Sequence, residues 1–189
     1  KLSKYNVILA SGSPRRQNFF KELDIDFEIR LKEIEEIYPN ELQGTEITDF
    51  LADLKSHPFD NELTENDLLI TSDTIVWFNN EALGKPKNYD EAFSMLKKMS
   101  GKKHSVITSI SIKNKNFQKI INDTTQVYFN ELSDDEINYY LENYKPYDKA
   151  GAYGIQEWIG KIGINKIEGS YFNVMGLPVH KLYKELINL

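Results

Sequence analysis

The sequence predicts an α/β fold in which helices flank a mixed β-sheet. Three observations support this prediction. An apolar run leads through a tight turn into a helical pattern near the start of the chain, two alternating segments are separated by a short Asn-rich turn, and helical periodicity recurs between the strand-like segments. Helices that alternate with both single strands and hairpins are typical of α/β proteins whose sheets combine parallel and antiparallel strands.

The first part of the chain predicts a strand, a turn and two helices. Tyr5–Ala10 is an apolar run, which predicts a buried strand. Ser13 suits the N-cap of the following helix, and Pro14 suits its first turn because an N–H at that position has no helical partner. This helix is expected to end near Leu23. A second helix is expected at 46–56, where apolar residues recur at helical spacing.

The middle of the chain combines short strands with one helix. We expect strand segments at 68–70 and 75–78, interrupted by the polar residues 71–74. A pair of asparagines at 79–80 predicts a turn. A helix is expected to be capped by Asn88 and to run to Met99, because a Glu follows the cap three residues later and a Gly lies beyond the end.

The last part of the chain predicts a hairpin followed by helices. Alternation at 105–113 and 118–130 predicts two paired strands. The sequence from Ser133 to Glu136 forms a capping box for a helix that is expected to end near Tyr144. Glycines punctuate 151–169, which we expect to be strand-like, and Pro178 is expected to begin a last helix.

Length and composition exclude several classes of protein. The 189 residues suit one domain over residues 1–189, in which two lobes would flank a cleft. With 23 basic and 29 acidic residues the net charge is −6, which argues against a nucleic-acid partner. The absence of cysteine excludes disulfides and thiolate metal sites. Because no apolar run is long enough for a membrane span or a signal-peptide core, we expect a cytoplasmic protein without a membrane partner.

The segment Ser11–Arg16 is the first candidate binding site. A strand that turns into a helix directs backbone N–H groups and the positive end of the helix dipole toward one point, and Gly12 lets an anion approach the backbone. Arg15 and Arg16 lie in the first helical turn, where cations oppose the dipole, and their guanidinium groups match phosphate oxygens. We therefore favour a phosphate site. The alternative is a capped helix with two solvated arginines.

A carboxylate lies between apolar strand residues at Asp73. Burying a carboxylate is unfavourable unless it is paired or binds a metal. This position therefore suggests a metal ligand or a general base. The alternative is an aspartate in a turn or bulge that bonds to its own backbone.

Two lysines and one glutamate are weaker candidates. Lys85 follows a strand-like segment and precedes a proline, but a solvated loop lysine would give the same pattern. Lys55 lies beside the apolar stripe of its helix. The alternative is a surface lysine whose methylene groups cover apolar residues while its ammonium group stays in solvent. Glu36 belongs to an acid-rich stretch that is solvated by default.

The segment 151–156 combines glycines with an aromatic residue, which suggests that the backbone passes close to a flat ligand or to another strand. The Gln156 amide can both donate and accept hydrogen bonds, as recognition of a base edge requires. The alternative is a glycine-rich bend in the sheet. His104, Trp77 and Trp158 are expected to be structural residues.

Together these motifs resemble those of the Maf family of nucleoside triphosphate pyrophosphatases. The similar segments follow one another over nearly the whole chain: Leu9–Arg16, Ser72–Val76, Leu83–Pro86, Ser100–Thr108, Ala150–Gln156, Gly169–Tyr171 and Val174–Pro178. A set of motifs in order is far more specific than any one of them. The departures are small: Ser72 stands where Ala or Gly is usual, and 158–166 is less regular.

The resemblance implies a mixed α/β fold like that of inosine triphosphate pyrophosphatases, with two lobes around a cleft, and often a homodimer. It implies hydrolysis of a nucleoside triphosphate between the α and β phosphates with a divalent metal cation, Mg²⁺ or Mn²⁺. The products would be the monophosphate and pyrophosphate. The Gly-Ala-Tyr-Gly-Ile-Gln segment is similar to the branch of the family that prefers dTTP and UTP.

The resemblance also assigns roles to single residues. Asp73 matches the proton acceptor, and Lys55 and Lys85 match catalytic cations. Glu36 matches an acidic position and would hold the metal together with Asp73. The positions that match phosphate-binding residues are Ser11, Arg15 and Arg16. The positions that match residues linked to the choice of base are Arg15, Thr74 and Gln156.

The leading hypothesis is therefore a dTTP/UTP pyrophosphatase that removes unwanted or modified nucleotides. One alternative is the same chemistry on another or a modified nucleotide. A second alternative is a non-catalytic nucleotide-binding regulator of cell division and septum formation. The presence of Asp73 and Lys85 favours catalysis, because a protein that only binds nucleotides does not need a base.

Overall fold

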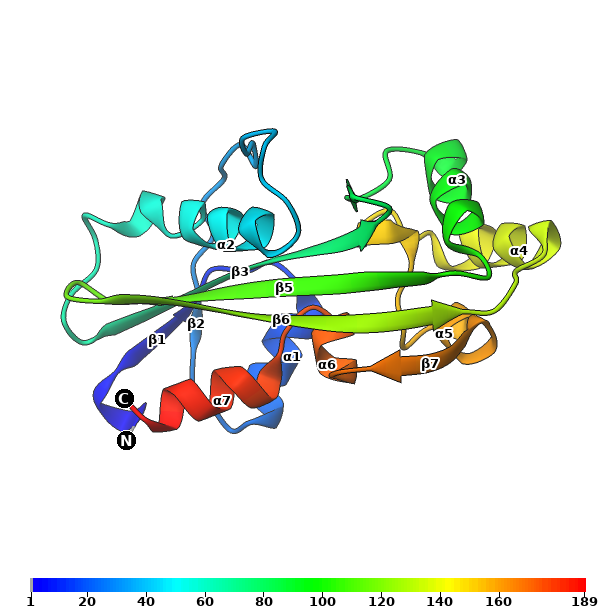
Figure 1. The fold of residues 1–189 in the computed structure, drawn as a ribbon. Helices are drawn as coiled ribbons and strands as arrows, with labels where there is room; N and C mark the ends of the chain where they lie inside the picture. Colours follow the sequence, from blue (N-terminus) through cyan, green and yellow to red (C-terminus); the bar gives the residue numbers. More distant parts are fainter. Residues whose placement is uncertain (1) are drawn as a thin grey trace. The chain divides into compact units, whose positions relative to one another are not determined.

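The computed structural model describes residues 2–189 as an α/β protein with a mixed sheet (Figure 1), which confirms the predicted fold class. The strands are β1 (Asn6–Leu9), β2 (Glu28–Ile29), β3 (Asp67–Phe78), β4 (Glu81–Leu83), β5 (Lys103–Lys113), β6 (Gln118–Phe129) and β7 (Ile164–Glu168). The α-helices are α1 (Pro14–Glu22), α2 (Thr45–Leu54), α3 (Tyr89–Met99), α4 (Asp134–Tyr144), α5 (Trp158–Gly163), α6 (Tyr171–Val174) and α7 (Val179–Ile187). Short 3₁₀ segments lie at Leu2–Lys4, His57–Phe59 and Ala150–Ala152.

The sheet has the strand order β2-β1-β3-β5-β6-β7, and β4 pairs with β3. β1 runs parallel to both β2 and β3, whereas the β3–β4 and β6–β7 pairs are antiparallel. The chain forms two compact units, and β3, β5 and β6 contribute residues to both. No helix within residues 2–189 has the length and apolar character that a membrane span needs.

The first unit contains residues up to 73 together with 108–123 and 176–189. Its β1 is almost fully buried, and Ile8 lies opposite Glu28 of β2 and Leu69 of β3. Ile8 and Leu69 pack with Phe59 and Leu63 in one of its apolar clusters. The turn between β1 and α1 therefore starts from a rigid strand, and this turn contains the first candidate site.

The second unit contains 74–107 and 124–175. Its core gathers apolar side chains of β3, β5 and β6 with those of α3 and α4, and these two helices pack against each other (Figure 1). The predicted capping box of α4 is present, since the Ser133 hydroxyl accepts from the Glu136 N–H while the Glu136 carboxylate accepts from the Ser133 N–H. The Asn79-Asn80 turn between β3 and β4 is also confirmed, with both residues at positive φ.

Two local expectations are wrong. The polar residues 71–74 do not interrupt a strand, because β3 is continuous from Asp67 to Phe78. The Thr71 hydroxyl donates to the Ala52 carbonyl of α2, and Asp73 Oδ1 accepts from Lys55 at the end of that helix. The segment 151–169 is strand-like only in β7, since Gly151 turns the chain with φ 69° and α5 follows. The expected N-cap of α1 is confirmed, since Ser13 occupies it and its carbonyl accepts the N–H of Gln17, although its hydroxyl makes no capping bond.

Candidate active site

The centre of the first unit's candidate site is the carboxylate of Asp73. Asp73 lies on β3 and is only 5% exposed. Its Oδ1 accepts a hydrogen bond from Lys55 Nζ at 2.7 Å. Within residues 2–189 its Oδ2 has no hydrogen-bond partner, although the atom is buried. A buried carboxylate oxygen without a partner is unfavourable for folding, and proteins commonly retain such an atom where it has a functional role or contacts a water or an ion.

Lys55 links Asp73 to a second carboxylate. It is the C-cap residue of α2, and its Nζ lies 2.7 Å from Asp73 Oδ1 and 3.2 Å from Glu36 Oε1. The side chains of Lys55 and Asp73 are 18% and 7% exposed, whereas that of Glu36 is 51% exposed. The cluster thus extends from a buried carboxylate to a solvated carboxylate, with one ammonium group between them.

Arg16 is held in the same unit by backbone carbonyls. Its Nε donates to the Gly176 carbonyl at 2.9 Å, and its Nη1 donates to the Ser72 carbonyl at 3.0 Å. Nη1 also lies 3.5 Å from the hydroxyl of Ser11, a buried residue at the end of the turn after β1. The backbone next to Asp73 therefore helps to fix the position of this guanidinium group.

The charge of Arg16 is retained despite its desolvation. The pKa of Arg16 is lowered to about 10, mainly by burial and also by the positive charge of Arg15, and the negative charges of Asp73 and Glu36 partly oppose this change. A pKa of about 10 keeps the guanidinium group protonated at neutral pH. A desolvated cation is favoured electrostatically when an anion lies nearby.

The first turn of α1 has no acidic residue, and half-buried Arg15 precedes Arg16 there. Gly12 is exposed in the turn before the helix, and a Cβ at this position would meet only Leu31 Cδ1 at 3.7 Å, which is an ordinary contact. Packing within the described residues therefore does not require glycine at position 12. Close approach of an anion to the backbone would account for the glycine at this position.

Two candidate site residues of the second unit, Lys85 and Gln156, lie in loops. Lys85 follows β4 and is exposed, and none of residues 2–189 pairs with its ammonium group. The carbonyl of the preceding Gly84 accepts the N–H of Gly151 at 3.0 Å. A Cβ on Gly151 would lie 2.7 Å from Val76 Cγ2, so only glycine allows this close approach. The backbone hydrogen bond between Gly84 and Gly151 therefore holds the Lys85 loop next to the glycine-rich 151–156 loop.

Buried tyrosines fix the path of the glycine-rich loop. The Tyr140 hydroxyl accepts the N–H of Gly154 at 3.0 Å and donates to the carboxylate of Glu157. The Tyr153 hydroxyl lies 2.6 Å from Nε2 of His104. Burial raises the pKa of both tyrosines and lowers the pKa of His104 to about 4. His104 is thus a neutral structural residue, as the sequence predicts.

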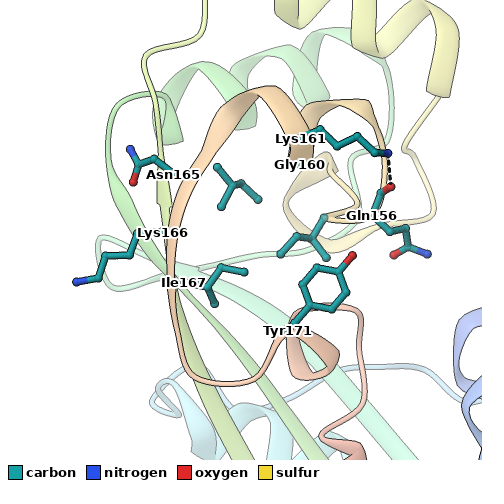
Figure 2. Close-up of a pocket in the computed structure, with 9 residues that line it drawn as sticks. Gln156, Gly160, Lys161, Asn165, Lys166, Ile167 and Tyr171 are labelled. Atoms are coloured by element: carbon teal, nitrogen blue, oxygen red, sulfur yellow. Dashed lines mark hydrogen bonds between the residues drawn. The ribbon is translucent and has the colours of Figure 1, made fainter.

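Gln156 lies at the exposed end of this loop (Figure 2). Its backbone carbonyl accepts from Lys161 Nζ at 3.0 Å, while its side-chain amide points away from that contact and has no partner in the described part of the chain. Gln156 lines an open pocket of about 490 Å³ between α5, β7 and Tyr171. The free amide can therefore pair with a ligand.

The structure brings some sequence candidates together and leaves others in the second unit. Ser11, Arg16 and Asp73 meet around the Ser72 backbone, and Lys55 joins Asp73 to Glu36. Thr74, Lys85 and Gln156 belong to the second unit. Sequence reasoning missed Thr71, Tyr140 and Glu157, which support these segments. The two-residue spacing of Thr71 from Asp73, on one face of a strand, is a signal that could have revealed the first of them.

Two carboxylates could hold a metal ion in the first unit. Among the described residues, no group of three or more His, Asp or Glu side chains is arranged as a metal site. Mg²⁺ is commonly bound by one or two carboxylates together with substrate phosphates and water. The unpartnered Asp73 Oδ2 and the half-exposed Glu36 fit that requirement, so the residues present are compatible with a shared protein–substrate metal site.

Comparisons with known proteins agree on the family. The family described as Maf-like protein matches residues 6–189. A dTTP/UTP pyrophosphatase of Flavobacterium psychrophilum is 64% identical over 188 residues, which cover 100% of this chain and 96% of the relative. Proteins with the same name from Flavobacterium johnsoniae and Christiangramia forsetii are 62% and 57% identical, and the matches cover 100% and 98% of this chain and 97% and 94% of those relatives.

A solved structure supports the fold independently. The Ham1 protein of Staphylococcus aureus has a TM-score of 0.55 and 17% sequence identity, and the match covers 95% of this chain and 99% of that chain. At this identity the likeness concerns the fold alone.

Proposed function

Because the chain belongs to the Maf-like protein family, we propose that it is a nucleoside triphosphate pyrophosphatase that acts on dTTP and UTP. The reaction would yield the nucleoside monophosphate and pyrophosphate. The names of three relatives that are 57–64% identical over nearly the whole chain support this substrate class. We further propose that residues 1–189 act as one Maf-like domain in the cytoplasm.

The observation that carries the proposal is the buried carboxylate of Asp73, with one oxygen on Lys55 and the other without a partner. A carboxylate with a free oxygen can accept a proton from an attacking water molecule. The water oxygen would bond to the α-phosphorus while the bond from this phosphorus to the bridging oxygen breaks. Pyrophosphate then leaves with the bridging oxygen, and the proton of the water passes to Asp73 Oδ2.

Cations would stabilise the charge that develops on the phosphates. The carbonyl partners of Arg16 position its guanidinium group without cancelling its charge. Arg15 and Ser11 lie at the same strand-to-helix turn, which suits phosphate oxygens. Lys85 matches a catalytic cation of the family, and we propose the same role for it here. Phosphoryl transfer depends mainly on such positioning and charge stabilisation.

A divalent cation, Mg²⁺ or Mn²⁺, is part of the proposal, since Maf-like nucleotide pyrophosphatases generally use one. Asp73 and Glu36 would hold it. When bound, the metal would supply positive charge to the phosphates and orient the attacking water. Lys55 lies between the same two carboxylates and keeps them near each other before substrate arrives.

Gln156 would contribute to the choice of base. Uracil and thymine present an N3–H donor flanked by carbonyl acceptors, and a glutamine amide can pair with such an edge. A bound purine would leave polar groups of the site without hydrogen-bond partners, and this cost would disfavour purine nucleotides as substrates. The free side-chain amide of Gln156 supports this role. Arg15 and Thr74 are proposed to act with it.

The test is a panel of nucleoside triphosphates with Mg²⁺ in water enriched in ¹⁸O. The proposal predicts pyrophosphate from dTTP and UTP, little product from ATP and GTP, and the heavy oxygen in the monophosphate because water attacks the α-phosphorus. Orthophosphate as the first product, or label in pyrophosphate, would contradict the mechanism. No hydrolysis by folded protein would favour a nucleotide-binding regulator instead.

Two further expectations need their own measurements. A homodimer is predicted by the family resemblance, and sedimentation of the purified protein tests it. Hydrolysis of modified pyrimidine nucleotides is tested by adding modified dTTP and UTP analogues to the same panel.

A further inference from the structure

We propose that Thr71 is a positioning residue that sets the place of Lys55 relative to the Asp73 carboxylate. The inference rests on the proposed function, in which Asp73 is the base. It names a residue that has no role in the sequence motifs described above.

Thr71 connects β3 to the end of α2. Its hydroxyl donates to the carbonyl of Ala52 at 2.6 Å, and both residues are fully buried. Ala52 lies three residues before Lys55, in the last turn of α2. The hydrogen bond therefore fixes the part of the helix from which the Lys55 side chain extends.

The Ala52 carbonyl depends on this hydroxyl because the helix ends here. In a continuing helix the N–H of Ser56 would donate to Ala52, but that N–H donates to the Asp53 carbonyl at 2.8 Å. The Thr71 hydroxyl thus donates to the Ala52 carbonyl, which has no helical N–H partner because the helix ends here. If the hydroxyl were removed, a buried carbonyl would lose its partner and the last turn would have to shift.

The Thr71–Ala52 and Asp73–Lys55 hydrogen bonds both join one face of β3 to one face of the α2 C-terminus. Thr71 and Asp73 are two residues apart on β3, so they lie on the same face of the strand. Ala52 and Lys55 are three residues apart on α2, so they lie on the same face of the helix. The Thr71–Ala52 bond and the 2.7 Å Asp73–Lys55 bond are therefore adjacent links between the same two elements.

A matched control exists nearer the other end of α2. The Thr48 hydroxyl accepts from the buried Ser109 hydroxyl at 2.7 Å, and Thr48 is as buried as Thr71. Thr48 lies seven residues before Lys55, about two helical turns away. The same substitution at both threonines therefore removes a buried hydroxyl between α2 and a strand of the sheet, β3 for Thr71 and β5 for Thr48, but only Thr71 bonds to the helix end next to Lys55.

The experiment measures kcat and KM for UTP, together with thermal unfolding, in wild type, Thr71→Val, Thr71→Ser and Thr48→Val. We expect Thr71→Val to lower kcat about 10- to 100-fold, because displacements of about 1 Å have effects of that size. KM should change by less than about threefold, because Thr71 acts by placing Lys55 against the Asp73 carboxylate rather than through substrate binding. Thr71→Ser retains the donor and should keep kcat within about threefold of wild type. Thr48→Val should lower the unfolding temperature without this loss of kcat.

A double variant separates positioning from general destabilisation. In a Lys55→Met background, Thr71→Val should change kcat by less than about twofold, since the group it positions is absent. If Thr71→Val does not fold, Thr71→Ala is measured in both backgrounds with the same expectations. Unchanged kcat in both nonpolar variants, or an equal loss in the Lys55→Met background, would overturn the inference. If wild type itself releases no pyrophosphate, the proposed function fails instead.

Discussion

Acid should destabilise this protein through one buried histidine. His104 is 2% exposed, its Nε2 lies 2.6 Å from the Tyr153 hydroxyl, and its Nδ1 has no hydrogen-bond partner among the described residues. The rings of Phe129 and Tyr153 lie edge-on to the imidazole, with centroids 4.9 and 5.4 Å away. A proton on His104 would place a charge among aromatic side chains.

The sign and size of the effect follow from the two pKa values. Burial lowers the pKa of His104 from 6.5 to about 4. As the pH falls, the unfolded chain binds the proton first, so the stability that neutral His104 contributes is complete above pH 6.5 and is lost between pH 6.5 and about 4. Each pH unit in this range corresponds to about 1.4 kcal/mol. The free energy of unfolding should thus fall by about 2 kcal/mol from pH 7.5 to pH 5 because of His104.

Urea unfolding at the two pH values, followed by tryptophan fluorescence, measures this change. His104→Gln is the matched variant, because glutamine cannot be protonated in this range and can still bond to the Tyr153 hydroxyl. The variant should be less stable at pH 7.5 and should lose about 2 kcal/mol less than wild type on acidification. Equal losses in the two proteins would show that His104 does not titrate in this way, and the reasoning would be refuted.

Three further substitutions test the candidate site. Asp73→Asn should lower kcat by a factor on the order of 10² to 10⁴ while leaving the protein folded, and a rate near that of wild type would remove Asp73 from the mechanism. Gln156→Ala should change the ratio of kcat/KM for UTP to that for ATP more than it slows UTP, and an unchanged ratio would exclude the proposed base contact. Ser72→Ala should raise the free energy of unfolding by about 1 kcal/mol, because the Ser72 hydroxyl is buried without a partner among the described residues. A less stable Ser72→Ala variant in urea unfolding would mean that this hydroxyl has a favourable role.

The elements that sequence predicts well are those whose signals are local. The strand before Ser11, the capped helices α3 and α4 and the β5–β6 hairpin depend on periodicity and on caps within a few residues. The polar stretch within β3 could not be understood in this way. Its hydrogen bonds go to Ala52 and Lys55, which are 19 and 18 residues earlier in the chain. A local sequence pattern therefore shows that these residues are polar, but it does not show which distant residues will bond to them.

The same distinction applies to the candidate site. The turn at 11–16 was predicted from its own residues, because a strand, a glycine and a helix start lie together there. Lys55 and Glu36 are weak candidates from their own residues, because solvated side chains would give the same local patterns, and their roles rest on the family resemblance. The structure places Lys55 against both Asp73 and Glu36, while their chemical roles stay predictions. The loop at 151–156 was misjudged because the Tyr140 hydroxyl, on a preceding helix, fixes its path.

Several locally unfavourable features occur together in the first unit. Two arginines oppose the dipole of α1, and burial lowers the pKa of one of them. Next to them, the Ser72 hydroxyl and one Asp73 oxygen are buried without partners within residues 2–189. Each feature alone reduces stability, and proteins commonly keep such features where function requires them. A metal-bound triphosphate would relieve most of them at once, since its phosphate oxygens suit the arginines and its cation suits the free Asp73 oxygen. This convergence supports a polyanion site more strongly than any single residue does.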